Sequence, residues 1–247
     1  MIVYGRNPVR EALRGRRSVS RVWATRRAVE GEPWLGDDSD VAGTERRSPR
    51  HPRPAVVDSD EIERLCESPD HQGVCAEVGP YPYADPNALL AAEDALVVCL
   101  DEVQDPHNLG AVCRVAESAG AAGVVIPERR SAEVTPAACK ASAGAVEHLA
   151  VARVTNLANW LGSAKEAGAW VYGAAATEEA APYDSVDYRG KVVLVLGSEG
   201  RGLRPRVAAS CDRAVALPQR GRVNSLNVST AAAALMYGIL HLRERRA

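Results

Sequence analysis

The sequence predicts an α/β protein built around a mostly parallel β-sheet with helices on both faces. Short apolar runs such as Ala95–Leu100 and Val192–Leu196 lack the alternation of a strand with one solvent-facing side. Segments with helical spacing, such as Leu109–Ala119 and Leu157–Ala167, lie between such runs. Strands buried on both faces and separated by helices are typical of parallel sheets.

The other elements follow from local patterns in chain order. Arg6–Leu13 has helical spacing with a proline in its first turn, residues 58–67 resume a helical pattern, and Gly73–Val78 alternates like a strand. Further strands are predicted at Val19–Ala24, Gly123–Ile126, Leu149–Val154, Trp170–Ala174 and Ala214–Leu217, and a long final helix at Ser225–Leu242.

These patterns divide the 247 residues unevenly. Residues 1–79 form a small α/β unit, the proline-bearing residues 80–93 a linker, and residues 94–247 the larger sheet domain. Residues 31–55 are polar and rich in Pro, Gly and Ser, so we expect a mobile loop there.

Composition excludes several classes of protein. The six cysteines lack C-x-x-C spacing and the five histidines are isolated, so neither a metal site nor a Ser–His–Asp site is indicated. Free thiols and the absence of a signal peptide or a membrane-spanning apolar run favour a cytoplasmic protein.

Positive charge is concentrated near the N-terminus. The whole chain has a net charge of −2, but residues 1–30 hold eight arginines and only two acidic residues. Such a cluster is either a solvated helix face or a surface for a phosphate backbone, and charge alone does not decide between them.

Three loops that follow predicted strands carry polar residues where ligands bind in open parallel sheets. The first, Asp101–Arg114, contains Asn108, which we expect to cap the next helix, and Gly110, which lets another backbone approach. By itself, this segment is better explained as a capped helix with an exposed Arg114.

The second loop is L-G-S-E-G-R-G-L, Leu196–Leu203. Its glycines allow the backbone to lie close to a ligand. Glu199 in the middle argues against a phosphate-binding loop, because a fixed anion repels phosphate.

The third loop is Leu217–Ser229, in which Leu217 ends a strand and Ser225 begins the long final helix with Asn227 in its first turn. Each feature alone fits an ordinary helix start.

Taken together, the three loops resemble the three motifs of the SpoU family, within the SPOUT class of RNA methyltransferases. The matching patterns are N-x-G-x-x-x-R at Asn108–Arg114, L-G-x-E-G-x-G at 196–202, and L-P at 217–218 followed by S-L-N-V-S at 225–229. Y-G-R-N-P-V-R-E-A-L at 4–13 and H-Q-G-V at 71–74 resemble the auxiliary domain of the bacterial 23S rRNA guanosine-2′-O-methyltransferases, a domain similar to ribosomal-protein RNA-binding modules.

The resemblance implies a deep trefoil knot in the C-terminal domain and a homodimer formed through that domain. It also implies that S-adenosyl-L-methionine binds in the knot, held mainly by backbone groups. By residue-wise comparison, the cofactor-binding residues are Gly197, Glu199, Gly200, Leu217, Ser225 and Leu226.

The implied reaction is methyl transfer to a ribose 2′-hydroxyl, and the implied catalytic residues are Asn108, Arg114, Glu199, Ser225 and Asn227. A guanidinium does not readily give up its proton, so we expect Arg114 to orient an RNA phosphate and to stabilise alkoxide charge. A role as base would require desolvation beside other cations. We expect Glu199 to pair with Arg114 or its neighbours, and Asn108 to hold the ribose or Arg114.

An RNA substrate also favours phosphate contacts for the N-terminal arginines Arg6, Arg10, Arg14, Arg16 and Arg17. The leading interpretation is a 23S rRNA guanosine methyltransferase, with neither a metal, a membrane nor DNA as partner. The alternatives are a tRNA ribose methyltransferase, an rRNA methylase that confers antibiotic resistance, and an RNA-binding protein that keeps the fold without turnover.

Overall fold

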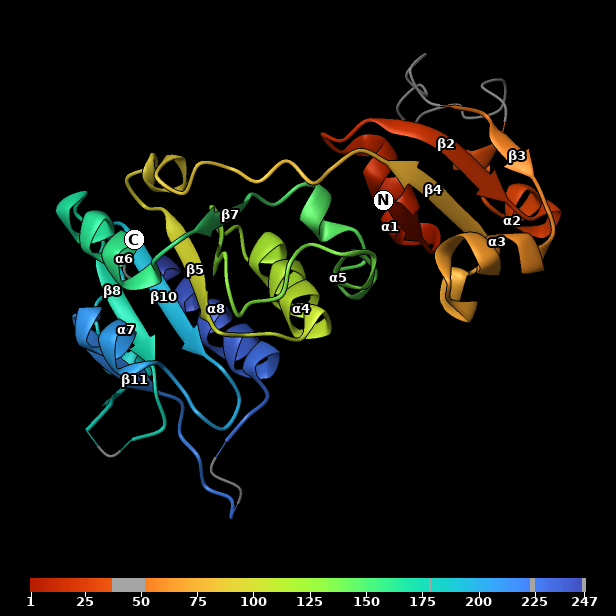
Figure 1. Ribbon diagram of the computed structural model, residues 1–247. Coiled ribbons are helices and arrows are strands. Elements are labelled where there is room, and N and C mark those ends of the chain that lie inside the picture. The colour runs from red at the N-terminus through yellow and green to blue at the C-terminus, as the bar shows by residue number, and fades with distance from the viewer. Residues whose placement is uncertain (37–51, 178, 223–224, 246–247) are drawn as a thin grey trace.

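The computed structural model describes residues 1–36, 52–177, 179–222 and 225–245. These residues form a smaller and a larger β-sheet, each with its own helices, side by side along the chain (Figure 1). The predicted α/β class is confirmed, and every strand pairing in the larger sheet is parallel.

The smaller sheet has the strand order β1-β4-β2-β3 within the described residues. Its pairings are antiparallel except between β2 and β3, which are parallel. The strands are β1 (Ile2–Tyr4), β2 (Val19–Ala24), β3 (Pro54–Val56) and β4 (Val74–Val78), and the helices are α1 (Arg6–Arg14), α2 (Arg26–Gly31) and α3 (Ser59–Cys66).

The larger sheet has the strand order β7-β6-β5-β10-β8-β11-β9. Its strands are β5 (Leu96–Asp101), β6 (Gly123–Pro127), β7 (Val151–Val154), β8 (Trp170–Ala174), β9 (Ala181–Pro182), β10 (Val192–Gly197) and β11 (Arg213–Ala216). The helices are α4 (Pro106–Ser118), α5 (Pro136–Ala141), α6 (Leu157–Glu166), α7 (Pro205–Ser210) and α8 (Val228–Glu244).

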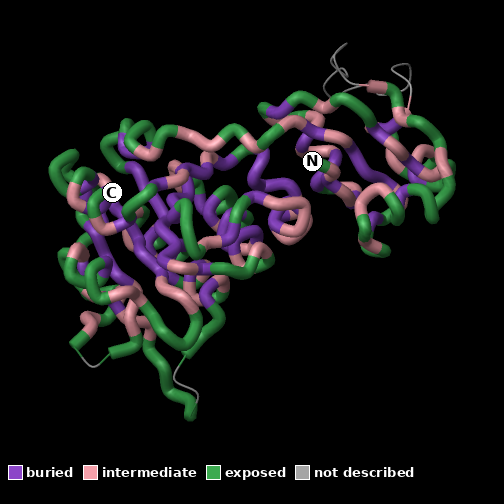
Figure 2. Tube along the Cα trace, viewed as in Figure 1, coloured by how far each residue is buried: buried purple, intermediate pink, exposed green. Residues whose placement is uncertain are grey.

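Helices cover both faces of the larger sheet because its central strands are apolar on both sides. In β5, Val98 and Leu100 pack in the core that contains α4, α5 and α8, whereas Val97 and Cys99 pack in the core that contains α6 and α7. All of β5 is buried, and Figure 2 shows buried residues concentrated in these strands. The prediction of continuous apolar strands covered on two faces is therefore confirmed.

The strand order places the carboxyl ends of β5 and β10 side by side. The chain runs outward from β5 through β6 and β7, continues at β8 on the other side, and returns to insert β10 between β5 and β8. In Figure 1 the arrowheads of β8 and β10 both point to the lower end of the sheet. Such a reversal of strand order leaves a crevice in which ligands bind in open α/β sheets.

The predicted loop at residues 31–55 is wrong in two places. A 3-10 helix spans Pro33–Leu35, with Leu35 buried in the core, and β3 begins at Pro54. Residues 37–51 lie outside the described residues, where the prediction of a loop is untested.

The smaller sheet's elements contact the larger unit through α1 and the segment that follows β4. The Tyr81 hydroxyl donates to the carbonyls of Val146 (2.8 Å) and Leu149 (3.2 Å). Arg17, after α1, forms a buried ion pair with Glu147, their side chains being only 1% and 2% exposed. Charged groups from sequence-distant segments thus join the two units.

Within the described ranges, no helix is long and apolar enough to cross a membrane. The same residues contain no cluster of His, Cys, Asp and Glu suited to a metal ion, and the six cysteines are free thiols.

Candidate active site

Three polar side chains from three segments meet at the carboxyl edge of the larger sheet. The Asn227 amide donates to Glu199 Oε1 (2.6 Å) and to Asn108 Oδ1 (2.9 Å). The Asn108 amide donates to the same Glu199 oxygen at 3.1 Å. The Glu199 carboxylate therefore joins the segments that follow β5, β10 and β11, which carry the three sequence motifs.

Asn108 lies inside the first turn of α4 and does not cap it, contrary to our expectation. The cap is Asp105, whose carboxylate accepts from the backbone N–H of His107 at 2.8 Å. Pro106 then takes the first helical position, which suits proline. Because Asp105 caps the helix, the amide of Asn108 is left for Glu199 and Asn227.

Asn227 is the N-cap of α8, so the prediction of a helix beginning at Ser225 is also wrong. The Asn227 side-chain oxygen accepts from the backbone N–H groups of Ser229 (2.9 Å) and Thr230 (3.4 Å). Its side-chain nitrogen is then directed to Asn108 and Glu199. The cap thus fixes the orientation of the amide within the site.

The loop after β10 folds tightly back on itself. The Gly202 N–H donates to the Ser198 carbonyl at 2.9 Å. A Cβ at Gly197 would overlap the backbone of Gly202, so no larger residue fits at the start of this loop. Gly200 and Gly202 have φ of +78° and +67°, and a Cβ at either would point into open space. The backbone at these two glycines is therefore uncovered.

A buried carboxylate that no sequence pattern singled out anchors this loop. Asp101, fully buried at the end of β5 beside Gly197, accepts from the Arg204 backbone N–H (2.8 Å) and from its Nε (2.7 Å). Arg204 Nη1 also lies 3.6 Å from Glu102 Oε1. A charged residue that ends an otherwise apolar strand is the signal that could have identified Asp101.

Arg114 lies on the exposed side of α4, six residues after Asn108. It has no hydrogen bond or ion pair with any residue that the structure describes, so the expected pairing with Glu199 is absent. Glu199 Oε1 accepts from Asn108 and Asn227. The Arg114 guanidinium is therefore free to meet an anion from solution.

The remaining predicted cofactor residues border the same edge. Leu217 directly follows β11, and Ser225 and Leu226 directly precede the cap of α8. Leu226 is apolar yet 45% exposed, next to a polar cluster. Cofactor contacts at these residues stay a prediction.

The N-terminal arginines differ among themselves in the groups that they contact. Arg6 pairs with Glu32 (2.9 Å), Arg10 and Arg14 with Glu11 (3.0 and 3.4 Å), and Arg16 donates to the His148 carbonyl (3.4 Å). RNA contacts at these four arginines stay a prediction.

The prediction for Arg17 is wrong, because its side chain is buried against Glu147 and is not at the surface. Burial lowers the pKa of the Arg17 guanidinium, but hydrogen bonding and charge from Glu147 outweigh burial and raise it. Arg17 is a charged residue of the contact between the two units.

Comparison with known proteins identifies the family of the part of the chain that contains all three loops. The model of the SpoU rRNA methylase family matches residues 95–237, and the chain belongs to that family. It is 37% identical, over 98% of its length and 96% of the relative's, to a Staphylococcus saprophyticus protein provisionally described as a TrmH family tRNA/rRNA methyltransferase.

Two solved structures differ in how much of this chain they match. An AdoMet-bound rRNA methyltransferase from Sinorhizobium meliloti covers 97% of the chain, and 86% of that protein is covered, with a TM-score of 0.78 and 23% identity. The A. aeolicus TrmH/SpoU tRNA modifying enzyme matches 64% of this chain, and 80% of that enzyme's own length is matched, with a TM-score of 0.57 and 26% identity.

Proposed function

We propose that this protein transfers a methyl group from S-adenosyl-L-methionine to a ribose 2′-hydroxyl in RNA. The observation that carries the proposal is the joining of Asn108, Glu199 and Asn227 by direct hydrogen bonds at the carboxyl edge of the sheet. Membership of the SpoU rRNA methylase family, whose model covers all three residues, supports methyl transfer as the reaction.

The residues at the edge fit S-adenosyl-L-methionine. Uncovered backbone at Gly200 and the carbonyl of Gly202 can meet polar atoms of the cofactor, whereas the Gly202 N–H donates to Ser198. The exposed Leu226 offers an apolar surface to the adenine ring. Glu199 supplies negative charge suited to the amino group or the sulfonium. We propose Gly197, Glu199, Gly200, Leu217, Ser225 and Leu226 as the cofactor-binding residues.

When bound, S-adenosyl-L-methionine supplies a methyl group on a positively charged sulfur, which is open to attack in line by an oxygen. The chain's own residues position that oxygen. Arg114 binds a phosphate beside the target ribose and stabilises negative charge as the hydroxyl passes its proton to solvent water. Asn108 and Asn227 hold Glu199 in place and shape the ribose pocket, with Ser225 beside them. DNA is not a substrate, because it lacks the 2′-hydroxyl.

Ribosomal RNA is the substrate class that we propose, with a guanosine of 23S rRNA as the target. The solved structure named as an rRNA methyltransferase matches both units of this chain, whereas the one named as a tRNA modifying enzyme matches 64% of it. We propose that the part of this chain that the latter structure does not cover is the N-terminal unit, which suits an auxiliary RNA-binding role. tRNA is the alternative substrate.

The proposed division of the chain assigns RNA binding to residues 1–79, a linker to residues 80–93 and catalysis to residues 94–247. We propose a trefoil knot in the catalytic domain and a homodimer formed through it. The 49% exposed Tyr237 on α8 supports an apolar contact surface there. Unpaired cysteines support action in the cytoplasm, where thiols stay reduced.

The decisive test is Arg114→Ala, measured by transfer of radiolabelled methyl groups to total rRNA. We expect kcat to fall by about 100-fold or more, as for removal of one donor that stabilises developing negative charge, with cofactor affinity by calorimetry unchanged. Arg206→Ala, at an exposed position on α7, is the matched control and should leave methylation unchanged. Near wild-type methylation by a folded Arg114→Ala protein would contradict the assignment.

The substrate is tested by mapping 2′-O-methylation across rRNA and tRNA in cells with and without the gene. Loss of one methylated 23S rRNA guanosine is expected. Loss of a tRNA methylation in its place would select the alternative, and loss of none would favour an RNA-binding protein without turnover.

A further inference from the structure

The loop that follows β6 lies beside the candidate active site and is tightly held. β6 is the neighbour of β5 in the parallel sheet, so the loops after both strands emerge at the same edge. The Ala132 N–H donates to the Val103 carbonyl at 2.8 Å, which joins the loop to the segment that leads into α4. Ala132 and Val134 are buried, so the loop has fixed anchors on the protein side.

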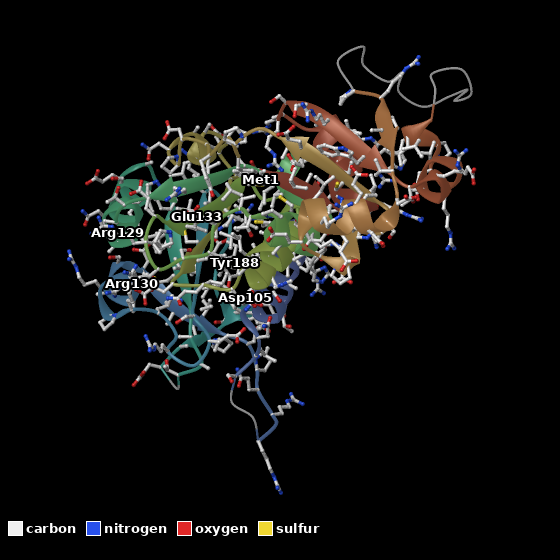
Figure 3. All side chains as sticks on the ribbon, turned by 45° about the vertical axis from the view of Figure 1, so that its right-hand side comes forward. Met1, Asp105, Arg129, Arg130, Glu133 and Tyr188 are labelled. Atoms are coloured by element: carbon white, nitrogen blue, oxygen red, sulfur yellow. The ribbon has the colours of Figure 1, made fainter. Side chains whose placement is uncertain are left out.

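This loop presents two arginines outward. Arg129 and Arg130 are exposed, and Figure 3 places both at the outer edge of the molecule, on the side away from the smaller sheet. Arg130 has a 76% exposed side chain and only a long ion pair, 3.6 Å, with Glu102. Arg129 has no hydrogen bond or ion pair with a described residue.

The acidic residues of the same loop are occupied elsewhere. The Thr155 hydroxyl donates to Glu128 Oε2 at 3.1 Å, and Glu133 pairs with Arg153 at 3.3 Å. Glu102 is shared between Arg130 and Arg204, each at 3.6 Å. The outer surface of the loop therefore carries two exposed guanidinium groups: Arg129 has no carboxylate partner among the described residues, and Arg130 has Glu102 at 3.6 Å.

The backbone of this loop is also unusual. Arg130 has φ of +57°, a left-handed conformation that costs a non-glycine residue of order 1 kcal/mol or more. Glu102, its partner, has φ of +58°. A strained arginine held on buried anchors at the edge of a reaction site is typical of a residue placed for a ligand.

We propose that Arg129 and Arg130 bind phosphates of the RNA strand that carries the target ribose. This inference rests on the proposed function and adds to it a second phosphate-binding point, separate from Arg114. Guanidinium groups match phosphate oxygens with two parallel hydrogen bonds, which suits recognition of a backbone independent of sequence. With Arg114 on α4 and these two arginines on the loop after β6, the RNA strand would be held at two separate points.

The test compares Arg129→Ala/Arg130→Ala with wild type in binding a fluorescein-labelled 20-residue oligoribonucleotide of mixed sequence over a range of salt. Each lost phosphate contact reduces the slope of log affinity against log salt by about 0.7 for a single strand, so we expect a decrease of about 1.4. Methylation of total rRNA should show a raised KM for RNA with kcat nearly unchanged. Arg213→Ala, at the exposed start of β11 on the opposite edge, is the matched control for general charge.

An unchanged salt slope in the double variant would overturn the proposal, as would a decrease of the same size per residue in Arg213→Ala. Cofactor affinity, measured by calorimetry, must stay at wild-type level, which separates a lost RNA contact from a damaged fold. If the wild type binds the RNA with the expected slope but methylates none, the proposed function fails while this binding site stands.

Discussion

Arginines gather in two regions of this molecule, and the two regions differ in what their guanidinium groups touch. On α1, Arg6, Arg10 and Arg14 each have a carboxylate within 3.4 Å. At the carboxyl edge of the larger sheet, Arg114 and Arg129 have no such partner among the described residues. The cluster that is dense in sequence is partly neutralised in space, whereas the scattered arginines are the more available ones.

Each region also contains one arginine that is committed to the fold. Arg17 is buried against Glu147 between the two units, and Arg204 is held by the buried Asp101 beneath the loop after β10. Density of charge in a sequence therefore does not distinguish a phosphate-binding arginine from a structural one. The distinction depends on the acidic groups that folding brings near.

The largest effect is expected from Arg17→Met. It leaves Glu147 buried without its partner, and removing one member of a buried ion pair costs about 3–5 kcal/mol in free energy of unfolding, measured by urea denaturation. Arg17→Met/Glu147→Met should recover most of that loss, because no buried charge is then left unpaired. The double variant should bind RNA as the wild type does. A clear loss of RNA affinity in it would restore Arg17 as an RNA contact.

Asp101→Asn should have an intermediate effect on stability. It tests whether Arg204 has a structural role, unlike the unpaired arginines at the same edge. The amide keeps the shape of the carboxylate but loses charge-assisted hydrogen bonds to Arg204, worth about 2 kcal/mol. Because these bonds anchor the loop that carries Glu199, we also expect a cofactor Kd about tenfold higher by calorimetry, equal to about 1.4 kcal/mol.

Asp212→Asn is the control for this change. Asp212 accepts from the Val171 N–H and pairs with Lys165, so its loss destabilises the sheet without touching the loop after β10. An equal weakening of cofactor binding in both variants would contradict a specific role for Asp101.

The sequence predicted the sheet and the three loops because both depend on local patterns. Continuous apolar runs identified β5 and β10, and turn residues after strands identified the loops that contain Asn108, Glu199 and Asn227. The hydrogen bonds among these three residues join positions 28, 91 and 119 residues apart, and no local pattern contains them. The same limitation applies to the helix starts. Asp105 and Asn108 are both plausible caps for α4, and Ser225 and Asn227 for α8, so only the fold decides.

The fate of the N-terminal arginines could not be predicted for a related reason. Glu11 lies on α1 itself, and its pairing with Arg14 fits the spacing of a helix turn. Glu147, in contrast, is 130 residues from Arg17 and reaches it only through the contact between the two units. The loop after β6, residues 127–134, contains no sequence motif. Its proposed role in RNA binding follows from the contacts that its acidic residues make in the fold.

The smallest expected effect comes from Glu11→Gln. This change should leave arginines of α1 without a carboxylate partner, as Arg114 and Arg129 are at the carboxyl edge of the larger sheet. Burial raises the pKa of Glu11, but hydrogen bonds with His148 and Arg10 and the charges of Arg14 and Arg10 outweigh it and hold the pKa below its usual 4.5. A carboxylate with a depressed pKa stabilises the fold above its unfolded-state pKa, and this contribution is lost as pH falls through the folded-state value. The variant should thus be less stable than wild type by under about 1 kcal/mol at pH 7. The difference should shrink as pH falls below 4.5 and vanish below the folded-state pKa of Glu11.

The same variant releases Arg10 and Arg14, so its affinity for the labelled oligoribonucleotide should rise by about twofold at low salt. Glu30→Gln removes an equal charge from an exposed position on α2 without freeing either arginine, and its affinity should rise less. If both variants gain equally, the pairing with Glu11 does not restrain these arginines. The two regions would then differ only in overall charge. If breaking the ion pair costs no free energy, a paired guanidinium binds RNA as readily as an unpaired one.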